Sequence, residues 1–195
     1  MRKRLFIPTV LLGQDNQGDL LELTVDSTVF FNDNSFKSLV GCHLDAAIEI
    51  ASRVLPLLPK PKRKSCLYLV NPNPYLSNSK GAGLGLVLAL FMLEKQCPHQ
   101  VLIVTGILDG STGKNDISIA DSGNLNLRLS AAMALGPQQQ ATPFLVPANS
   151  TVDSELVEKL ARFSIFVCPV RTLTEALKYC LSPLPNSVFS QGALI

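Results

Sequence analysis

Apolar runs and polar breaks alternate along the chain in a pattern that predicts strands and helices in turn. Short apolar runs bounded by Gly, Pro, Asn or Ser are typical of buried strands, whereas apolar residues three or four positions apart are typical of helices. These criteria predict strands over residues 5–12, 20–25, 66–70, 101–105, 117–119, 143–146 and 164–168. They predict helices over residues 36–58, 81–95, 125–135, 153–161 and 172–181. This order predicts an α/β (α+β) fold with mixed sheets and helices packed on them.

The helix predicted over residues 81–95 is distinctive because it is apolar on nearly every face. A helix of this kind is expected at the centre of a fold, where other elements cover all of its sides. Its start is rich in glycine, at Gly81, Gly83 and Gly85.

The length and composition of the chain indicate one compact domain. The 195 residues suit a single domain with a substantial core, and no linker divides them. We therefore predict one domain over residues 1–182 and an irregular C-terminal tail over residues 183–195. Hydrophobic residues make up 47% of the chain and charged residues 16%. This composition excludes a disordered chain and indicates a fairly apolar surface, which favours a protein partner.

Charge and cysteine content narrow the functional classes. The net charge of +2 is too small to indicate nucleic-acid binding, and the basic cluster at residues 60–64 is interpreted as a solvated loop. The five cysteines include no Cys-x-x-Cys pair, which favours reduced, mostly buried thiols and a cytoplasmic location. The apolar run at residues 5–12 lacks a signal-peptide cleavage site, and the longest apolar stretch, residues 84–93, is about half a membrane span. Neither secretion nor membrane association is therefore expected.

Several short strings follow one another in a characteristic order along nearly the whole chain. A small-residue string opens the central helix, a strand runs into Thr-Gly, and a Leu-x-Ala-Ala string precedes a glycine. A strand then ends in Val-Pro before an Asn, and a Pro-Val-x-Thr-Leu-x-Glu-Ala-Leu string closes the order. These strings lie at residues 79–84, 101–106, 129–132, 144–149 and 169–177. Together they resemble the proteolytic domain of Lon-type proteases, which implies a Lon-like fold.

The resemblance also implies where a catalytic dyad would lie. Lon-type peptidases use a serine nucleophile just before Ala-Gly and a lysine base shortly before Leu-x-Ala-Ala. The matching positions here are Gly81 and Asn126. Glycine has no side chain that could attack a carbonyl, and the amide of asparagine cannot act as a base. Arg128 stays protonated near neutral pH and cannot replace the lysine.

The resemblance therefore implies a catalytically inactive Lon-like domain, a pseudo-protease with a serine protease fold that acts as a protein-interaction or assembly module. Homo-oligomers are expected because Lon domains form rings. No Walker-type loop is present, so an ATP-driven role would need another protein. If the family's substrate cleft persists as a peptide groove, we expect it to be lined by Ser79, Lys80, Gly81, Thr105, Gly106 and Asn126.

Two active alternatives remain open. The first is a serine peptidase with a relocated dyad, Ser79 with Lys114, although Lys114 lies in a polar loop where it should be solvated. The second is nucleotide or phosphate binding by the Gly81–Gly85 loop, which resembles the phosphate loop of GHMP-type kinases. That loop continues into Leu86 where those kinases have serine, and its glycines could equally serve close helix packing.

The two histidines, His43 and His99, are interpreted as surface residues or as hydrogen-bonded structural residues. No spacing of His, Cys, Asp or Glu indicates a metal site, and no cofactor is expected.

Overall fold

The structure is a computed structural model that describes residues 2–10, 18–26, 66–70, 83–94, 97–99, 101–109 and 116–184. The helix predicted over residues 36–58, the basic cluster at residues 60–64 and residues 185–195 of the predicted tail lie outside the described residues.

A six-stranded mixed sheet forms the centre of the described fold, with the strand order β3-β2-β1-β4-β7-β8. Its strands are β1 (Arg2–Val10), β2 (Gly18–Asp26), β3 (Cys66–Val70), β4 (Val101–Val104), β7 (Thr142–Pro147) and β8 (Ile165–Val170). The strands β3, β2 and β1 pair antiparallel, whereas β1, β4, β7 and β8 pair parallel. A separate antiparallel ribbon contains β5 (Ile107–Asp109) and β6 (Ser118–Ala120).

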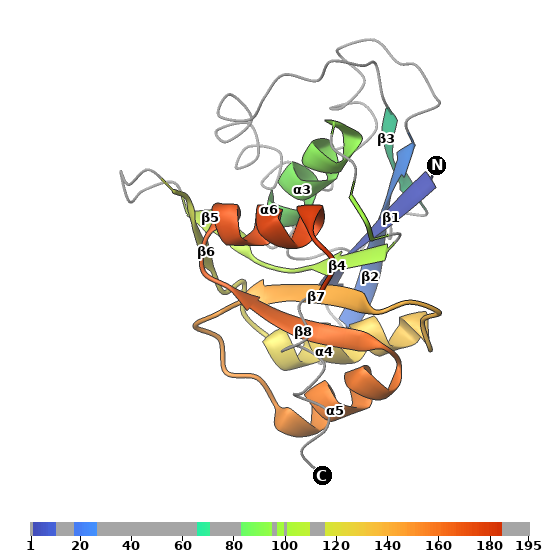
Figure 1. The fold of residues 1–195 in the computed structure, drawn as a ribbon. Coiled ribbons are helices and arrows are strands. Elements are labelled where there is room, and N and C mark those ends of the chain that lie inside the picture. The colour runs from blue at the N-terminus through green and yellow to red at the C-terminus, as the bar shows by residue number, and fades with distance from the viewer. Residues whose placement is uncertain are drawn as a thin grey trace.

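Helices cover both faces of the sheet, which confirms the predicted α/β class. The helices α3 (Gly83–Glu94) and α6 (Leu173–Leu181) pack on one face. The helices α4 (Leu125–Ala132) and α5 (Ser154–Arg162) pack on the other face, and a 3-10 turn, η4 (Met133–Leu135), continues α4. Figure 1 shows this arrangement, with α3 and α6 above the sheet and α4 and α5 below it.

Alternating side chains of the strands divide the core into two halves. In register across the parallel strands, Phe6, Ile103, Phe144 and Val167 point toward α4 and α5. Their chain neighbours, including Leu102, point toward α3 and α6. Phe6, Ile103, Phe144, Val167 and Leu102 are all buried. Burial of a large apolar side chain stabilises a fold by about 1.5–3 kcal/mol, so these rows hold the three layers together.

The central helix α3 approaches the sheet closely at a glycine. A Cβ atom placed on Gly85 would lie 2.6 Å from Cδ1 and 2.7 Å from Cγ1 of Ile7 in β1. Both residues are buried, as the all-round apolar pattern of the helix predicts. The missing side chain of Gly85 therefore lets the helix backbone lie directly on the strand.

The connections between the parallel strands do not all have the same hand. The strands β3, β1 and β4 run in one direction, and α3 connects β3 to β4 over one face of the sheet. The helices α4 and α5 connect β4 to β7 and β7 to β8, advancing the same way across the sheet but over the opposite face. The α3 connection therefore has the opposite hand to the other two. Nearly all such connections in proteins are right-handed, so this fold contains an uncommon crossover.

Several element limits differ from the prediction for physical reasons. Gly18 and Asp19, which precede the strand predicted over residues 20–25, belong to β2, because the absent side chain of Gly18 lets β2 approach the α4 backbone. The strand β1 begins at Arg2, and Arg4 of this segment pairs with Glu22 across the hairpin at 2.6 Å. The strand β5 was predicted as loop, and it forms by pairing with β6.

Candidate functional site

The carboxyl ends of the parallel strands lie along one edge of the sheet, where open α/β folds usually bind ligands. Thr105, Ala148 and Arg171 directly follow β4, β7 and β8 at this edge. A ligand site is therefore expected along this edge, which includes Thr105 and Gly106 of the predicted groove.

Thr105 and Gly106 are packed into the fold at the end of β4. Thr105 is fully buried, its hydroxyl lies 3.3 Å from the hydroxyl of Ser122, and its N–H donates to the Leu145 carbonyl at 3.0 Å. Gly106 has a φ of 147°, and a Cβ there would lie 2.7 Å from Cγ2 of Ile119. Both predicted groove residues thus serve the packing of the strand end.

Asn126 lies in the first turn of α4 with its side chain exposed to solvent. Its side-chain oxygen accepts a hydrogen bond from the N–H of Asp153 at 3.2 Å. Asp153 in turn caps α5, because its carboxylate accepts from the N–H of Glu155 at 2.9 Å. Asn126 therefore links the start of α4 to the start of α5, a role that sequence reasoning did not predict.

The other predicted site residues, Ser79, Lys80, Gly81 and Lys114, lie outside the described residues. The structure thus brings together Thr105 and Gly106 of the predicted groove, while the amide of Asn126 is engaged by the α5 cap. Of the glycine-rich loop, the structure describes Gly83 and Gly85, both buried within α3.

Arg128 is a fully buried cation beneath the turn that leads into α4. Its Nε donates to the Gly123 carbonyl at 3.0 Å, and its Nη1 donates to the Pro8 carbonyl of β1 at 2.5 Å. Burial lowers the pKa of Arg128, and the nearby Asp121 carboxylate opposes this shift. Within the described part of the chain, Nη2 has no hydrogen-bond partner. Arg128 therefore joins α4 to β1 through its two hydrogen bonds.

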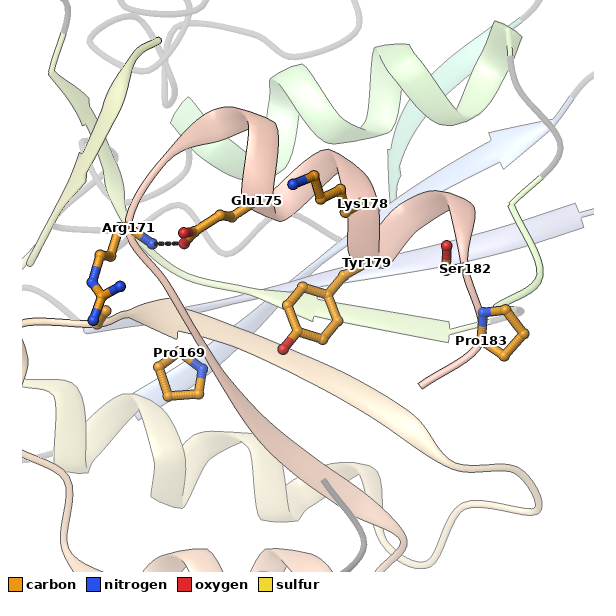
Figure 2. Close-up of a pocket in the computed structure, with 8 residues that line it drawn as sticks. Pro169, Arg171, Glu175, Lys178, Tyr179, Ser182 and Pro183 are labelled. Carbon is orange, nitrogen blue, oxygen red and sulfur yellow. Dashed lines mark hydrogen bonds between the residues drawn. The ribbon is translucent and has the colours of Figure 1, made fainter. Parts of the chain in front are cut away.

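Two open hollows adjoin at the carboxyl ends of β7 and β8. The α6 groove, of about 480 Å³, lies between β8 and α6 and is lined by Ala148, Pro169, Arg171, Glu175, Lys178, Tyr179, Ser182 and Pro183. The β6 groove, of about 470 Å³, is lined by Asp116, Ser118, Ile119, Ala148, Asn149, Arg171 and Thr172. Figure 2 shows the α6 groove, where Tyr179 points from the helix toward β8. The grooves share Ala148 and Arg171, and the predicted groove residues that the structure describes, Thr105, Gly106 and Asn126, do not line them.

The backbone N–H groups in the first turn of α6 already donate to acceptors of the chain itself. The Thr172 hydroxyl accepts from the N–H of Glu175 at 3.3 Å, so Thr172 caps the helix. The Asp116 carboxylate accepts from the N–H of Thr174 at 3.2 Å. Although burial opposes the shift, hydrogen bonds from Thr172, Thr174 and Ile117 lower the pKa of Asp116. This helix start therefore has little capacity for a bound anion.

His99, in the segment before β4, forms hydrogen bonds with the C-terminal end of α6. Its Nε2 lies 2.9 Å from the carbonyls of both Tyr179 and Ser182, and the ring is buried. Burial lowers the pKa of His99, while the bonds to Ser182 and Tyr179 oppose this. The interpretation of His99 as a hydrogen-bonded structural residue is confirmed; His43 lies outside the described residues.

The described cysteines with placed side chains, Cys97, Cys168 and Cys180, are free and buried, as predicted. Burial raises the pKa of Cys168 to about 12 and also raises that of Cys180. Such thiols stay protonated at neutral pH and are poor nucleophiles.

No protein-family model and no curated protein matches this chain. Across the described residues, no His, Cys, Asp or Glu side chains gather in a group that could hold a metal ion. The described helices are also too short or too polar to cross a membrane.

Sequence reasoning did not single out Arg171 and Tyr179, which line the α6 groove. A signal for Arg171 was present, because it lies three residues after the strand predicted over residues 164–168 and parallel strands align their carboxyl ends. For Tyr179, the helical spacing places the residue on α6 but does not show that its ring faces a hollow.

Proposed function

We propose that this chain is a catalytically inactive Lon-like domain that acts as a protein-interaction or assembly module. The order of its motifs supports this proposal, and the α/β fold with helices on both sheet faces is compatible with it. The proposal makes the chain a pseudo-protease whose surfaces bind a partner or a second copy.

Asn126 carries the argument, because it occupies the position that the resemblance assigns to the catalytic lysine. Its amide accepts a hydrogen bond from the backbone of Asp153 and has no group that could take a proton from a serine. Arg128 is the one cation within α4, and it is buried and bonded to two carbonyls. A serine–lysine mechanism therefore lacks its base at this position.

The surface at the strand ends supports a binding role. The α6 and β6 grooves adjoin at the edge where α/β folds present ligand sites, and they combine apolar and polar side chains. A module that binds a partner through this edge needs no catalytic group.

The decisive experiment is a casein cleavage assay with the wild type and with Ser79→Ala and Lys114→Ala variants. We expect the same background signal from all three proteins, and light scattering should report either an assembly or a complex with added peptide. Cleavage that the Ser79→Ala substitution removes would overturn the proposal in favour of the relocated dyad. Thermal stabilisation by ATP would instead favour the phosphate-binding alternative.

A second experiment tests the groove that the resemblance implies around Gly81. Unfolded casein peptides are titrated against the wild type and a Gly81→Trp variant, whose indole would fill that cleft. Weaker binding by the variant is expected if peptides use the cleft, and equal affinities would exclude this location.

A further inference from the structure

The α6 groove presents hydrogen-bond donors over an apolar floor. In Figure 2, Pro169 of β8 lies between Arg171 and Tyr179, and the Tyr179 hydroxyl points toward it from α6. Proline has no N–H, so this part of the floor leaves no backbone donor to satisfy. Ala148 and Pro183 add further apolar surface.

The carboxylates beside these donors are already engaged inside the fold. Glu175 accepts from the N–H of Arg171 at 2.6 Å, and Asp116 accepts from the N–H of Thr174 at 3.2 Å. In the described part of the chain, neither the Arg171 guanidinium nor the Tyr179 hydroxyl has such an acceptor. Lys178 also lines the α6 groove, so its charged side chains are two cations and one carboxylate, and this excess of positive charge suits a ligand that supplies an anionic acceptor.

The shape of the hollow favours an extended ligand. The volume of about 480 Å³ exceeds what one carboxylate needs, and the β6 groove of about 470 Å³ continues it through Ala148 and Arg171. Both hollows are open, as expected for a surface that receives a chain segment. Their lining combines polar side chains with the apolar Ala148, Pro169 and Pro183, which suits the polar and apolar side chains that an extended peptide can present.

We propose that the joined α6 and β6 grooves bind an extended acidic peptide, with a side-chain carboxylate on Arg171 and Tyr179 and a neighbouring apolar side chain on Pro169. This inference rests on the proposed function, because it names the ligand class of a binding module. Arg171 supplies the charge and planar donors, and Tyr179 supplies a second donor with an apolar ring.

The test uses immobilised hexapeptide mixtures that differ at one fixed position, which carries Asp or Glu in one set and Asn or Gln in the other. The wild type should bind the acidic set about tenfold more tightly, since a charged acceptor strengthens the bonds that it receives. Arg171→Gln should remove this preference, and Tyr179→Phe should reduce it by a few fold. Arg162→Gln is the matched control, because Arg162 is an exposed arginine on α5 outside both grooves.

Equal binding of the acidic and amide sets by the wild type would overturn the inference, and this comparison needs no variant to fold. A preference that persists in Arg171→Gln, or that Arg162→Gln removes equally, would also overturn it. Free glutamate that competes as strongly as acidic peptides would show a simple anion site and would have the same consequence.

Failure of this inference and failure of the proposed function give different results. Loss of the acidic preference leaves a non-catalytic module that uses another surface, and the casein assay would still be negative. Cleavage of casein that depends on Ser79 would reject the proposed function while the acidic preference could still be measured.

Discussion

The substitution Gly85→Ala tests whether the close approach of α3 to β1 requires glycine. The new methyl would lie 2.6 Å from Cδ1 and 2.7 Å from Cγ1 of the buried Ile7. Alanine favours the helix over glycine by about 1 kcal/mol, whereas overpacking a core costs about 1–3 kcal/mol. Because two atoms of a fully buried side chain must move, we expect the clash to prevail and the free energy of unfolding to fall by about 1 kcal/mol.

A double-mutant cycle isolates this contact from other effects of the substitution. Ile7→Ala alone removes both clashing atoms and should cost about 2–5 kcal/mol, because it leaves a cavity. In the double variant the added methyl occupies part of that cavity, so Gly85→Ala should stabilise the Ile7→Ala protein. The two substitutions should therefore be coupled by about 1–3 kcal/mol.

Urea denaturation followed by circular dichroism gives the four free energies that the cycle needs. A Gly85→Ala protein more stable than the wild type, or substitutions whose effects simply add, would refute the packing argument. Such a result would also strengthen the phosphate-binding alternative, since the glycine would then have no packing role.

Three further predictions concern buried polar groups. Arg128→Met should lower the free energy of unfolding by about 2–4 kcal/mol in urea, because two backbone carbonyls lose a charged donor; unchanged stability would contradict this. The lowered pKa of His99 means that, below about pH 6.5, the unfolded chain binds a proton that the folded chain does not. As the pH is lowered in this range, the free energy of unfolding should decrease by at most about 1.4 kcal/mol per pH unit. The substitution His99→Gln should flatten this part of a stability–pH curve. Brief alkylation followed by mass spectrometry should modify Cys168 and Cys180 in urea but not in the native protein, and native labelling would show that these thiols are accessible.

Local patterns predicted most of the described elements because burial and capping act over a few residues. The strand β3 has the predicted limits, and Asp153 and Thr172 cap α5 and α6 as their types and positions suggest. The all-round apolar character of α3 predicted its central position.

Features that depend on distant parts of the chain could not be predicted in the same way. The three residues of β5 become a strand only by pairing with β6. The burial of Arg128 depends on a carbonyl of β1, 120 positions away, which the local pattern of α4 does not encode. The hand of the α3 connection is likewise a property of the whole sheet, which no local pattern encodes.

The candidate site was predicted even less completely, because motif alignment locates positions but not the direction of side chains. Asn126 was singled out as a position without a base, and its bond to the α5 cap was not foreseen. The grooves around Arg171 arise where β6, β7, β8 and α6 meet, so they exist only in the folded chain.

Pro169 has a consequence for how copies of this chain could associate. The Ser164 carbonyl accepts from Thr142 of β7 and the Val170 carbonyl accepts from Ala148, so the backbone groups of even-numbered residues in β8 point toward β7. Those of Pro169 point the other way, where the described residues form no further strand. A strand from another molecule that pairs here would find no N–H at this position, and such interruptions protect natural sheets from edge-to-edge aggregation. Beyond Pro169, the Arg171 carbonyl is already taken by Ile119 of β6. Assembly through a continuous intermolecular sheet at β8 is therefore disfavoured, and a ring of this domain would have to join its copies at a surface other than this edge.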